Sequence, residues 1–205
     1  MIGILDYGVG NLVSVFNGLR YFSPDKDIRI ITTPNELSDC EKIVLPGVGA
    51  FTDARKLLEE SGLDEQLLIE AEKGKPILGI CLGMQLMATR SFEGKETLGL
   101  GLIPGDVVRF ERNDVKVPHM GWNGVRQEMS NALFKNLENE ADFYFVHSYH
   151  YQCANQHNVL ATTQYGIRFT SAVQHDNIIG IQFHPEKSQR NGLLLLKNFV
   201  ELLDG

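Results

Sequence analysis

One cysteine in this sequence stands where a nucleophile would. Cys81 lies between two glycines in the run GICLG, directly after the apolar segment 75–80. This pattern is typical of a tight turn from a strand into a helix, where glycine on either side removes Cβ atoms that would clash. The N-terminus of the helix that follows favours a thiolate and offers N–H groups to an oxyanion. A buried small hydrophobe is the commonest fate of a free cysteine, so the prediction of a nucleophile depends on finding a base.

A second motif supplies that base. His184 and Glu186 lie in the run GIQFHPEKS, at the end of an apolar segment. Residues i and i+2 of an extended backbone face the same side, so we expect the Glu186 carboxylate to reach the imidazole and fix its tautomer. The other ring nitrogen is then free for a thiol. Cys81, His184 and Glu186 therefore predict a nucleophile, its base and the group that orients the base.

The remaining histidines give weaker signals. His147 and His150 stand in the run HSYH, but no glutamate or third histidine falls at a ligand-like offset, so we expect no metal site. His157 and His175 lie in polar, loop-like segments and are expected at the surface. The sequence indicates no cofactor.

Elements that would position these residues follow from the hydrophobic pattern. In the first half, short apolar runs that end at glycine alternate with helical patterns, which is typical of a parallel sheet covered on both faces. The expected strands are 2–8, 28–33, 42–47 and 75–80. The expected helices are 11–22, 54–74 with a break near Gly62, and 82–90.

From about Leu98 the pattern changes to successive strands separated by turns. These strands are expected at 105–110, 115–125, 143–149, 159–165, 169–175 and 178–184, before a last helix at 192–203. The predicted fold class is α/β: an open, mostly parallel central sheet with helices on both faces plus an antiparallel portion. No linker or repeat interrupts the chain, so we expect one domain over residues 1–205.

Composition excludes several classes of protein. The chain has 205 residues, 43% hydrophobic, and a formal net charge of −7, which argues against a nucleic-acid or anionic-membrane surface. Neither a signal peptide nor an apolar stretch of membrane-spanning length is seen. The three cysteines are odd in number and widely spaced, which indicates neither a disulfide framework nor a zinc knuckle. We expect a cytoplasmic protein.

The motifs together resemble a known family. The runs GICLGMQL and QFHPEKS are similar to the signature of the class I, triad-type glutamine amidotransferases, whose fold is flavodoxin-like. Within that family, DYGVGNL, LPGVGAF, GLGLIPGDVVRF, VPHMGWN, YFVHSY and GIQFHPEKS resemble the glutaminase subunits of imidazole glycerol phosphate synthases. The resemblance runs from Asp6 to about Phe199.

This resemblance implies roles for the three catalytic residues. Cys81 would attack the side-chain amide of glutamine and form a thioester. His184, oriented by Glu186, would protonate the departing ammonia and then activate water. Glutamate and ammonia would be the products.

The resemblance also implies residues that bind the substrate. Backbone N–H groups of Leu82 and of the loop that contains Val48 and Gly49 would hold the oxyanion. The residues implied in glutamine binding are Gly47, Gln85, Glu93, Ser148 and Tyr149. In place of the two acids that the family often shows after a serine, this chain has Ser91-Phe92-Glu93, so Glu93 keeps only the second acid.

A partner is implied because the glutaminase accounts for nearly the whole chain. In the family, a separate (β/α)8-barrel cyclase docks over the glutaminase as a heterodimer and receives ammonia through a channel. It makes imidazole glycerol phosphate and an aminoimidazole carboxamide ribotide, a step of histidine biosynthesis. The residues implied at or near that interface are Asn11, His119, Trp122, Tyr144 and Lys187.

Other functions remain open at this stage. A paralogous glutaminase could feed another ammonia-dependent synthase, such as one that amidates a surface sugar, and a cysteine hydrolase or peptidase could use the same triad. A dinucleotide-binding module is disfavoured because the glycine pairs Gly8/Gly10 and Gly47/Gly49 lack the third glycine of the G-x-G-x-x-G motif. A pure interaction protein would not need a complete Cys/His/Glu set.

Overall fold

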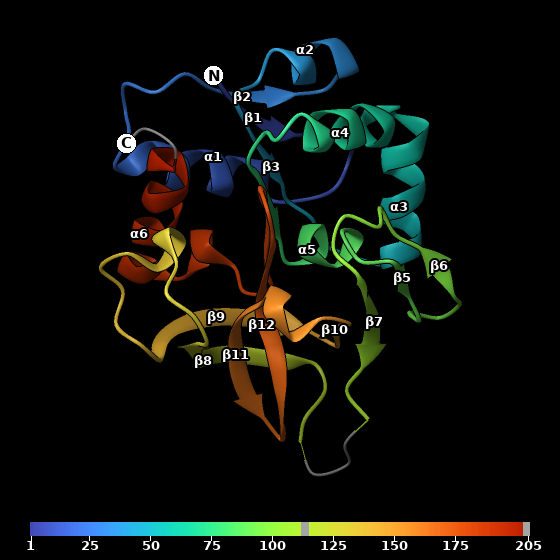
Figure 1. Cartoon of the computed structure of the whole chain (residues 1–205), viewed down its shortest axis with the longest axis vertical. Coiled ribbons are helices and arrows are strands. Elements are labelled where there is room, and N and C mark those ends of the chain that lie inside the picture. Colours follow the sequence, from blue (N-terminus) through green and yellow to red (C-terminus); the bar gives the residue numbers. More distant parts are fainter. Residues whose placement is uncertain (112–114, 203–205) are drawn as a thin grey trace.

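A five-stranded parallel region forms one half of the central sheet (Figure 1). The computed structural model describes residues 1–111 and 115–202. Strand order in this region is β2-β1-β3-β4-β13, and every adjacent pair is parallel. The bounds are β1 Ile2–Leu5, β2 Ile28–Ile31, β3 Lys42–Leu45, β4 Ile77–Ile80 and β13 Ile178–Ile181. All but the edge strand β2 are buried along their whole length, because helices cover both faces.

Beyond β13 the sheet becomes mainly antiparallel. Strand β12 pairs antiparallel with β13, and the order continues through β10, β7, β5 and β6. The bounds are β5 Arg90–Ser91, β6 Thr97–Leu98, β7 Gly105–Arg109, β10 Tyr149–Cys153 and β12 Ile167–His175. A branch leaves β12 through β11 to β8 and β9, with bounds β8 His119–Gln127, β9 Ala141–His147 and β11 Val159–Tyr165.

Helices cover the parallel region on both faces (Figure 1). Helices α1 (Leu12–Tyr21) and α6 (Gln189–Glu201) pack over one face and share an apolar core with the β8–β9 pair. The other face carries α2 Pro34–Ser38, α3 Phe51–Glu60, α4 Leu63–Glu72 and α5 Leu82–Leu86, which share a second apolar core. Short 3₁₀ turns are η1 Ala132–Phe134, η2 Gln156–Asn158 and η3 Pro185–Lys187.

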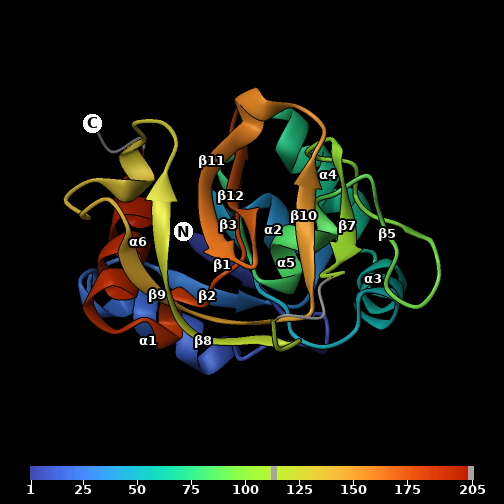
Figure 2. The same ribbon diagram turned by 90° about the horizontal axis from the view of Figure 1, so that it is seen from below.

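The long antiparallel pair β8–β9 lies below the carboxyl ends of the parallel strands (Figures 1 and 2). Two hydrogen bonds at Tyr144 join it to the segment after β13. The His184 N–H donates to the Tyr144 carbonyl at 2.9 Å, and the Tyr144 N–H donates to Ser188 Oγ at 2.9 Å. Open α/β folds bind ligands at the carboxyl edge of the sheet, and here the β8–β9 pair, called the ribbon below, covers that edge.

The structure confirms the predicted α/β class, with the parallel strands, the antiparallel second half and the helix break at Gly62, whose φ is +69°. The helix predicted over 82–90 was wrong in length, because α5 ends at Leu86 and the chain enters β5. The last helix begins at Gln189, earlier than expected, and position 203 of the prediction lies outside the described residues. Strands β5, β6 and β10 and helix α2 were not predicted.

Across residues 1–111 and 115–202, no helix is both long enough and apolar enough to cross a bilayer.

Candidate active site

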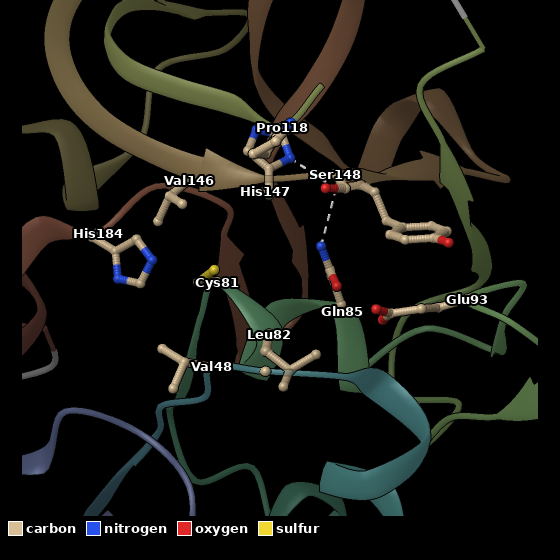
Figure 3. A pocket seen from close by; sticks show the side chains of 12 residues that line it. Val48, Cys81, Leu82, Gln85, Glu93, Pro118, Val146, His147, Ser148 and His184 are labelled. Carbon is tan, nitrogen blue, oxygen red and sulfur yellow. Dashed lines mark hydrogen bonds between the residues drawn. The ribbon is translucent and has the colours of Figure 1, made fainter. Parts of the chain in front are cut away.

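A cavity of about 320 Å³ opens at the carboxyl end of β4, beneath the β9–β10 connection (Figure 3). Its size is typical of sites for small metabolites. The residues that line it are Val48, Gly49, Cys81, Leu82, Gln85, Glu93, Pro118, Val146, His147, Ser148, Tyr149 and His184. Segments far apart in the sequence thus bring the predicted nucleophile and base to one pocket.

A strained backbone conformation at Cys81 directs its thiol into this cavity. Cys81 has φ 54° and ψ −109°, a conformation that non-glycine residues adopt only when the surroundings enforce it. A Cβ on Gly83 would lie 1.8 Å from the Leu45 carbonyl oxygen, and one on Gly79 would lie 2.8 Å from the Gly83 carbonyl. The steric role predicted for both glycines is therefore confirmed. The turn exists because the helix start packs directly on the neighbouring strand.

His184 and Glu186 form a buried pair. The His184 ring lies beside the Cys81 thiol (Figure 3). His184 Nδ1 lies 2.8 Å from Glu186 Oε1, and each side chain is only 2% exposed. The expected contact is present, but the extended backbone proposed for it was wrong, because residues 185–187 form the 3₁₀ turn η3. Nε2 of His184 has no hydrogen-bond partner among the described residues, which leaves that nitrogen available for proton transfer.

The electrostatics favour a charged imidazole. Burial by itself lowers the pKa of His184, but negative charge on the Cys81 sulfur and the Glu186 carboxylate outweigh it and raise the pKa to about 10. The Cys81 sulfur and the His184 imidazole therefore interact electrostatically within one buried site.

The glycine loop between β3 and α3 forms one wall of the cavity. Val48 and Gly49 line the cavity, whereas Gly47 lies behind it, where a Cβ would be 2.7 Å from Tyr7 Oη and 3.0 Å from Leu82 Cβ. Gly49 has φ +100°, which only glycine adopts readily. The loop therefore lies directly against the start of α5, where a Cβ on Gly47 would be 3.1 Å from the Gly83 nitrogen.

Four of the five residues expected to bind glutamine line the cavity: Gln85, Glu93, Ser148 and Tyr149. Glu93 Oε2 accepts a hydrogen bond from the Phe51 N–H at 2.9 Å, which ties the carboxylate to the first turn of α3. The Gln85 side chain donates to the Tyr149 carbonyl at 3.1 Å. Gly47, the fifth, supports the wall from behind.

Comparison with known proteins gives the family. Residues 4–202 match the model of the family described as glutamine amidotransferase class-I. The chain belongs to this family.

Relatives of this amidotransferase are similar over nearly the full chain. The imidazole glycerol phosphate synthase subunit HisH of Moorella thermoacetica is 47% identical, covering 98% of this chain and 95% of that protein. The HisH of Sulfurimonas denitrificans is 48% identical, covering 98% of each. HisH 2 of Pseudomonas aeruginosa is 45% identical, covering 99% of this chain and 100% of that protein.

Solved structures agree on the fold. A crystal structure of a glutamine amidotransferase superposes with a TM-score of 0.76 at 20% identity, covering 100% of this chain and 99% of that one. PurLQS from Thermotoga maritima gives a TM-score of 0.75 at 18% identity, covering 98% of each chain. These likenesses confirm the α/β architecture.

Two residues of this amidotransferase site were not predicted from the sequence. Gln182 is completely buried, donates to Cys81 Sγ at 3.7 Å and accepts from Gln85 Nε2 at 3.0 Å. His147, which had been considered only as a metal ligand, lines the cavity and makes a hydrogen bond to the Tyr149 carbonyl at 2.7 Å. In the sequence, the only sign that either residue lies in the site is that each is a polar residue at the end of an apolar run.

Hydrogen bonds lead from His147 into the β8–β9 ribbon. Because the Tyr149 carbonyl only accepts, His147 Nδ1 must carry the proton, so its Nε2 accepts from His119 Nδ1 at 3.0 Å. His119 Nε2 then accepts from Asn123 Nδ2 at 3.2 Å, and the same Nδ2 donates to the Gln164 carbonyl at 3.0 Å. Both ends of the chain are carbonyls, so every ring has a defined tautomer.

These histidines are neutral at pH 7. Burial lowers the pKa of His119 to about 4 and that of His147 to about 3, the latter despite the opposing effect of the Tyr149 carbonyl. His119 also stacks on Tyr165, with ring centroids 3.9 Å apart. Burial lowers the pKa of His150 as well. The ribbon is therefore held by uncharged, oriented rings.

Residues expected at the partner interface fall into two groups. Trp122 is 48% exposed, its ring centroid is 6.1 Å from that of Tyr144, and Lys187 Nζ lies 6.0 Å from the Tyr144 ring. Asn11 is exposed at the start of α1. His119 is only 2% exposed, so it lies beneath the surface, and its place at or near a partner interface stays a prediction.

No group of histidine, cysteine and acidic side chains that could hold a metal ion occurs within the described ranges. His157 and His175 are exposed, as expected.

Proposed function

We propose that this chain is the glutaminase subunit of imidazole glycerol phosphate synthase, a single domain over residues 1–205 that acts in the cytoplasm. The observation that carries the proposal is the Cys81–His184–Glu186 site in a chain 47% identical to a HisH over 98% of its length. It would hydrolyse glutamine and pass the ammonia to a cyclase subunit.

The acylation half-reaction uses the buried pair. The Cys81 thiolate attacks Cδ of glutamine, and the negative charge moves onto the amide oxygen. Backbone N–H groups of Leu82 and of the Val48–Gly49 loop then stabilise this oxyanion. His184 donates its Nε2 proton to the amide nitrogen as the Cδ–N bond breaks. Ammonia leaves, and a γ-glutamyl thioester remains on Cys81.

In the deacylation half-reaction His184 acts as a base. Its Nε2 accepts a proton from water, the oxygen attacks the thioester, and the C–S bond breaks to regenerate the thiolate–imidazolium pair with glutamate. Glu186, at 2.8 Å, keeps the Nδ1 proton in place through both steps. One histidine thus carries the proton in each direction.

Residues at the far end of the cavity would hold the amino-acid end of the substrate (Figure 3). Both hydrogens of Gln85 Nε2 are engaged, by Tyr149 and Gln182, so its Oε1 is the atom left to accept from the α-ammonium. Glu93 adds a negative charge there. The Ser148–Tyr149 segment faces the α-carboxylate.

The proposed partner is a (β/α)8-barrel cyclase that forms a heterodimer with this chain. The neighbouring side chains of Trp122, Tyr144 and Lys187 support this, with Trp122 48% exposed. Met120, on the same strand, is 62% exposed, and Asn11 is exposed at the start of α1. Exposed aromatic and methionine side chains are enriched at protein interfaces. Lys187 directly follows Glu186, so docking can act on the triad through η3.

The test uses Cys81→Ser in complex with the cyclase to separate glutamine hydrolysis from the synthesis that consumes ammonia. Glutamine-dependent synthesis is expected to fall by roughly 10³-fold or more, because the nucleophile is lost, while synthesis from ammonium salts continues at the wild-type rate. Loss of both activities would contradict this division of labour. The isolated wild-type chain is expected to turn over slowly and to be stimulated by the cyclase and its acceptor.

Identification of the native partner by copurification distinguishes the remaining alternatives. Recovery of a sugar-modifying synthase would assign the chain to a paralogous amidotransferase with the same glutaminase chemistry. Hydrolysis of peptides but not glutamine would indicate a cysteine peptidase.

A further inference from the structure

Gln182 is a buried amide in contact with the nucleophile. It lies one residue beyond β13 and two before His184, so one short segment carries both groups that face the Cys81 sulfur. Its backbone N–H donates to the Ser171 carbonyl at 2.9 Å, which anchors it to β12. Its side chain is 0% exposed. A fully buried amide must satisfy its polar atoms within the protein, so its contacts define its orientation.

The direction of the Gln182 amide follows from its neighbours. The Tyr149 carbonyl can only accept, so the Gln85 atom at 3.1 Å from it is nitrogen. The same nitrogen lies 3.0 Å from the end of Gln182, whose facing atom must therefore be the oxygen. The NH₂ group of Gln182 is left facing Cys81 Sγ at 3.7 Å. A rotation of the Gln182 amide by 180° would place two donors against each other and an oxygen against the sulfur.

We propose that Gln182 is a positioning residue that donates a hydrogen bond to the Cys81 sulfur and favours its thiolate form. A donor aimed at a charged acceptor is stronger than one aimed at a neutral group, so the bond strengthens as the proton leaves the thiol. Because the donor is buried, it acts at low local dielectric and needs no reorganisation. It also holds the sulfur in the strained elbow, opposite the imidazole.

Gln182 further joins substrate binding to the nucleophile. The hydrogen bonds run from the Tyr149 carbonyl through Gln85 and Gln182 to Cys81. The segment proposed to hold the amino-acid end of glutamine therefore fixes the donor that contacts the sulfur. That this sulfur is the glutaminase nucleophile rests on the proposed function, whereas the Gln182–Cys81 contact does not.

The test compares Gln182→Met and Gln182→Glu in the full chain. The rate of Cys81 alkylation by iodoacetamide is followed from pH 5 to 9 by mass spectrometry of the Cys81 peptide, which separates it from Cys40 and Cys153. For Gln182→Met, the pH midpoint is expected to rise by about one unit, since a hydrogen bond to a charged group contributes about that much. The kcat for glutamine, measured in the complex, is expected to fall about tenfold.

Gln182→Glu separates positioning from a merely structural role. The glutamate keeps the volume and the acceptor for Gln85, but it replaces the donor to sulfur with a negative charge. The alkylation midpoint is therefore expected to rise by more than in Gln182→Met, with kcat lower and the KM for glutamine within about twofold of wild type. If Gln182 serves only to hold Gln85, this variant will retain wild-type kcat and midpoint, and the proposal is overturned.

Controls keep every outcome informative. Ser171→Ala changes a buried side chain whose Oγ has no partner among the described residues, and it is expected to leave the midpoint and kcat unchanged. If neither Gln182 variant folds, Gln85→Met, which frees the Gln182 amide to rotate, should still raise the midpoint by about half a unit, and an unchanged midpoint overturns the proposal. Absence of glutamate release by the wild type would contradict the proposed function alone, because alkylation needs no substrate.

Discussion

The elbow around Cys81 and the β8–β9 ribbon keep their side chains in place by different physical means. At the elbow, five consecutive residues and one neighbouring strand force Cys81 to φ 54°, with a gap at Gly83 too small for a Cβ. In the ribbon, His119 and His147 are 28 residues apart and are held by ring-to-ring hydrogen bonds and stacking. Steric exclusion positions the proposed nucleophile, and oriented polar contacts support the pocket that surrounds it.

This difference predicts how each region responds to a substitution or to a change of pH. A steric constraint has no gradual response, because an added atom either fits or forces the backbone to move. A polar network loses free energy bond by bond and responds to pH. The first and the last of the following predictions test this contrast, and the second tests the His184–Glu186 pair.

The largest effect is expected for Gly83→Ala. Its Cβ would lie 1.8 Å from the Leu45 carbonyl oxygen, so the helix start must shift away from β3. We expect more than about 3 kcal/mol of lost unfolding free energy, measured by urea denaturation, and no detectable glutamine hydrolysis. Gly101→Ala is the control, because Gly101 has φ +67° and open space, and it should lose only about 1–2 kcal/mol. Equal losses in the two variants would contradict the steric account.

An intermediate effect is expected for Glu186→Gln. The amide keeps the shape of the carboxylate but removes a charge that raises the pKa of His184. The kcat for glutamine is expected to fall by roughly 10²-fold or more with KM little changed, because imidazolium is less stabilised in the transition state. Steady-state kinetics across pH 6–9 in the complex should also show the rate optimum displaced. A variant with wild-type kcat would remove Glu186 from the triad.

The smallest effect is a stability slope in mild acid from the ribbon. His119 and His147 have folded-state pKa values of about 4 and about 3, below the ordinary 6.5, so between pH 6.5 and 4 the unfolded chain binds protons that the folded chain does not. Unfolding free energy is therefore lost as pH falls through this window, by at most about 1.4 kcal/mol per unit for each histidine. Urea denaturation at pH 6.5 and 5.5 measures the slope.

His119→Asn is the matched variant for that slope. It should be less stable at pH 7 but lose less stability on acidification, by up to about 1.4 kcal/mol per unit. The exposed His157 serves as the control, since His157→Asn should leave the slope unchanged. An unaltered slope in His119→Asn would show that the ribbon histidines do not titrate on unfolding.

The same contrast explains what could be predicted from the sequence. The elbow is encoded within five neighbouring residues, and glycine has few reasons to flank a cysteine, so its geometry was predictable. The His184–Glu186 contact was predicted on the wrong backbone, because a proline-initiated 3₁₀ turn and an extended strand can both bring these two side chains together.

Long-range side-chain partners were not predictable in this way. Gln182 stands in a motif that was recognised, yet its contacts with Gln85 and Cys81 lie about 100 residues away in sequence, at separations of 97 and 101. His119 was expected at or near a docking face because of its place in the motif VPHMGWN, which carries the family resemblance. Side chains alternate along β8, and Tyr165 and Phe145 cover that ring from both sides.

The Tyr149 carbonyl oxygen has a final consequence for what the pocket can recognise. A carbonyl has two lone pairs, and His147 and Gln85 each direct one N–H at this oxygen. Its accepting capacity is therefore saturated before any substrate arrives. In the proposed binding mode, a cationic group therefore goes to the oxygens of Gln85 and Glu93 instead, and these hydrogen bonds determine which end of an amino acid faces that wall.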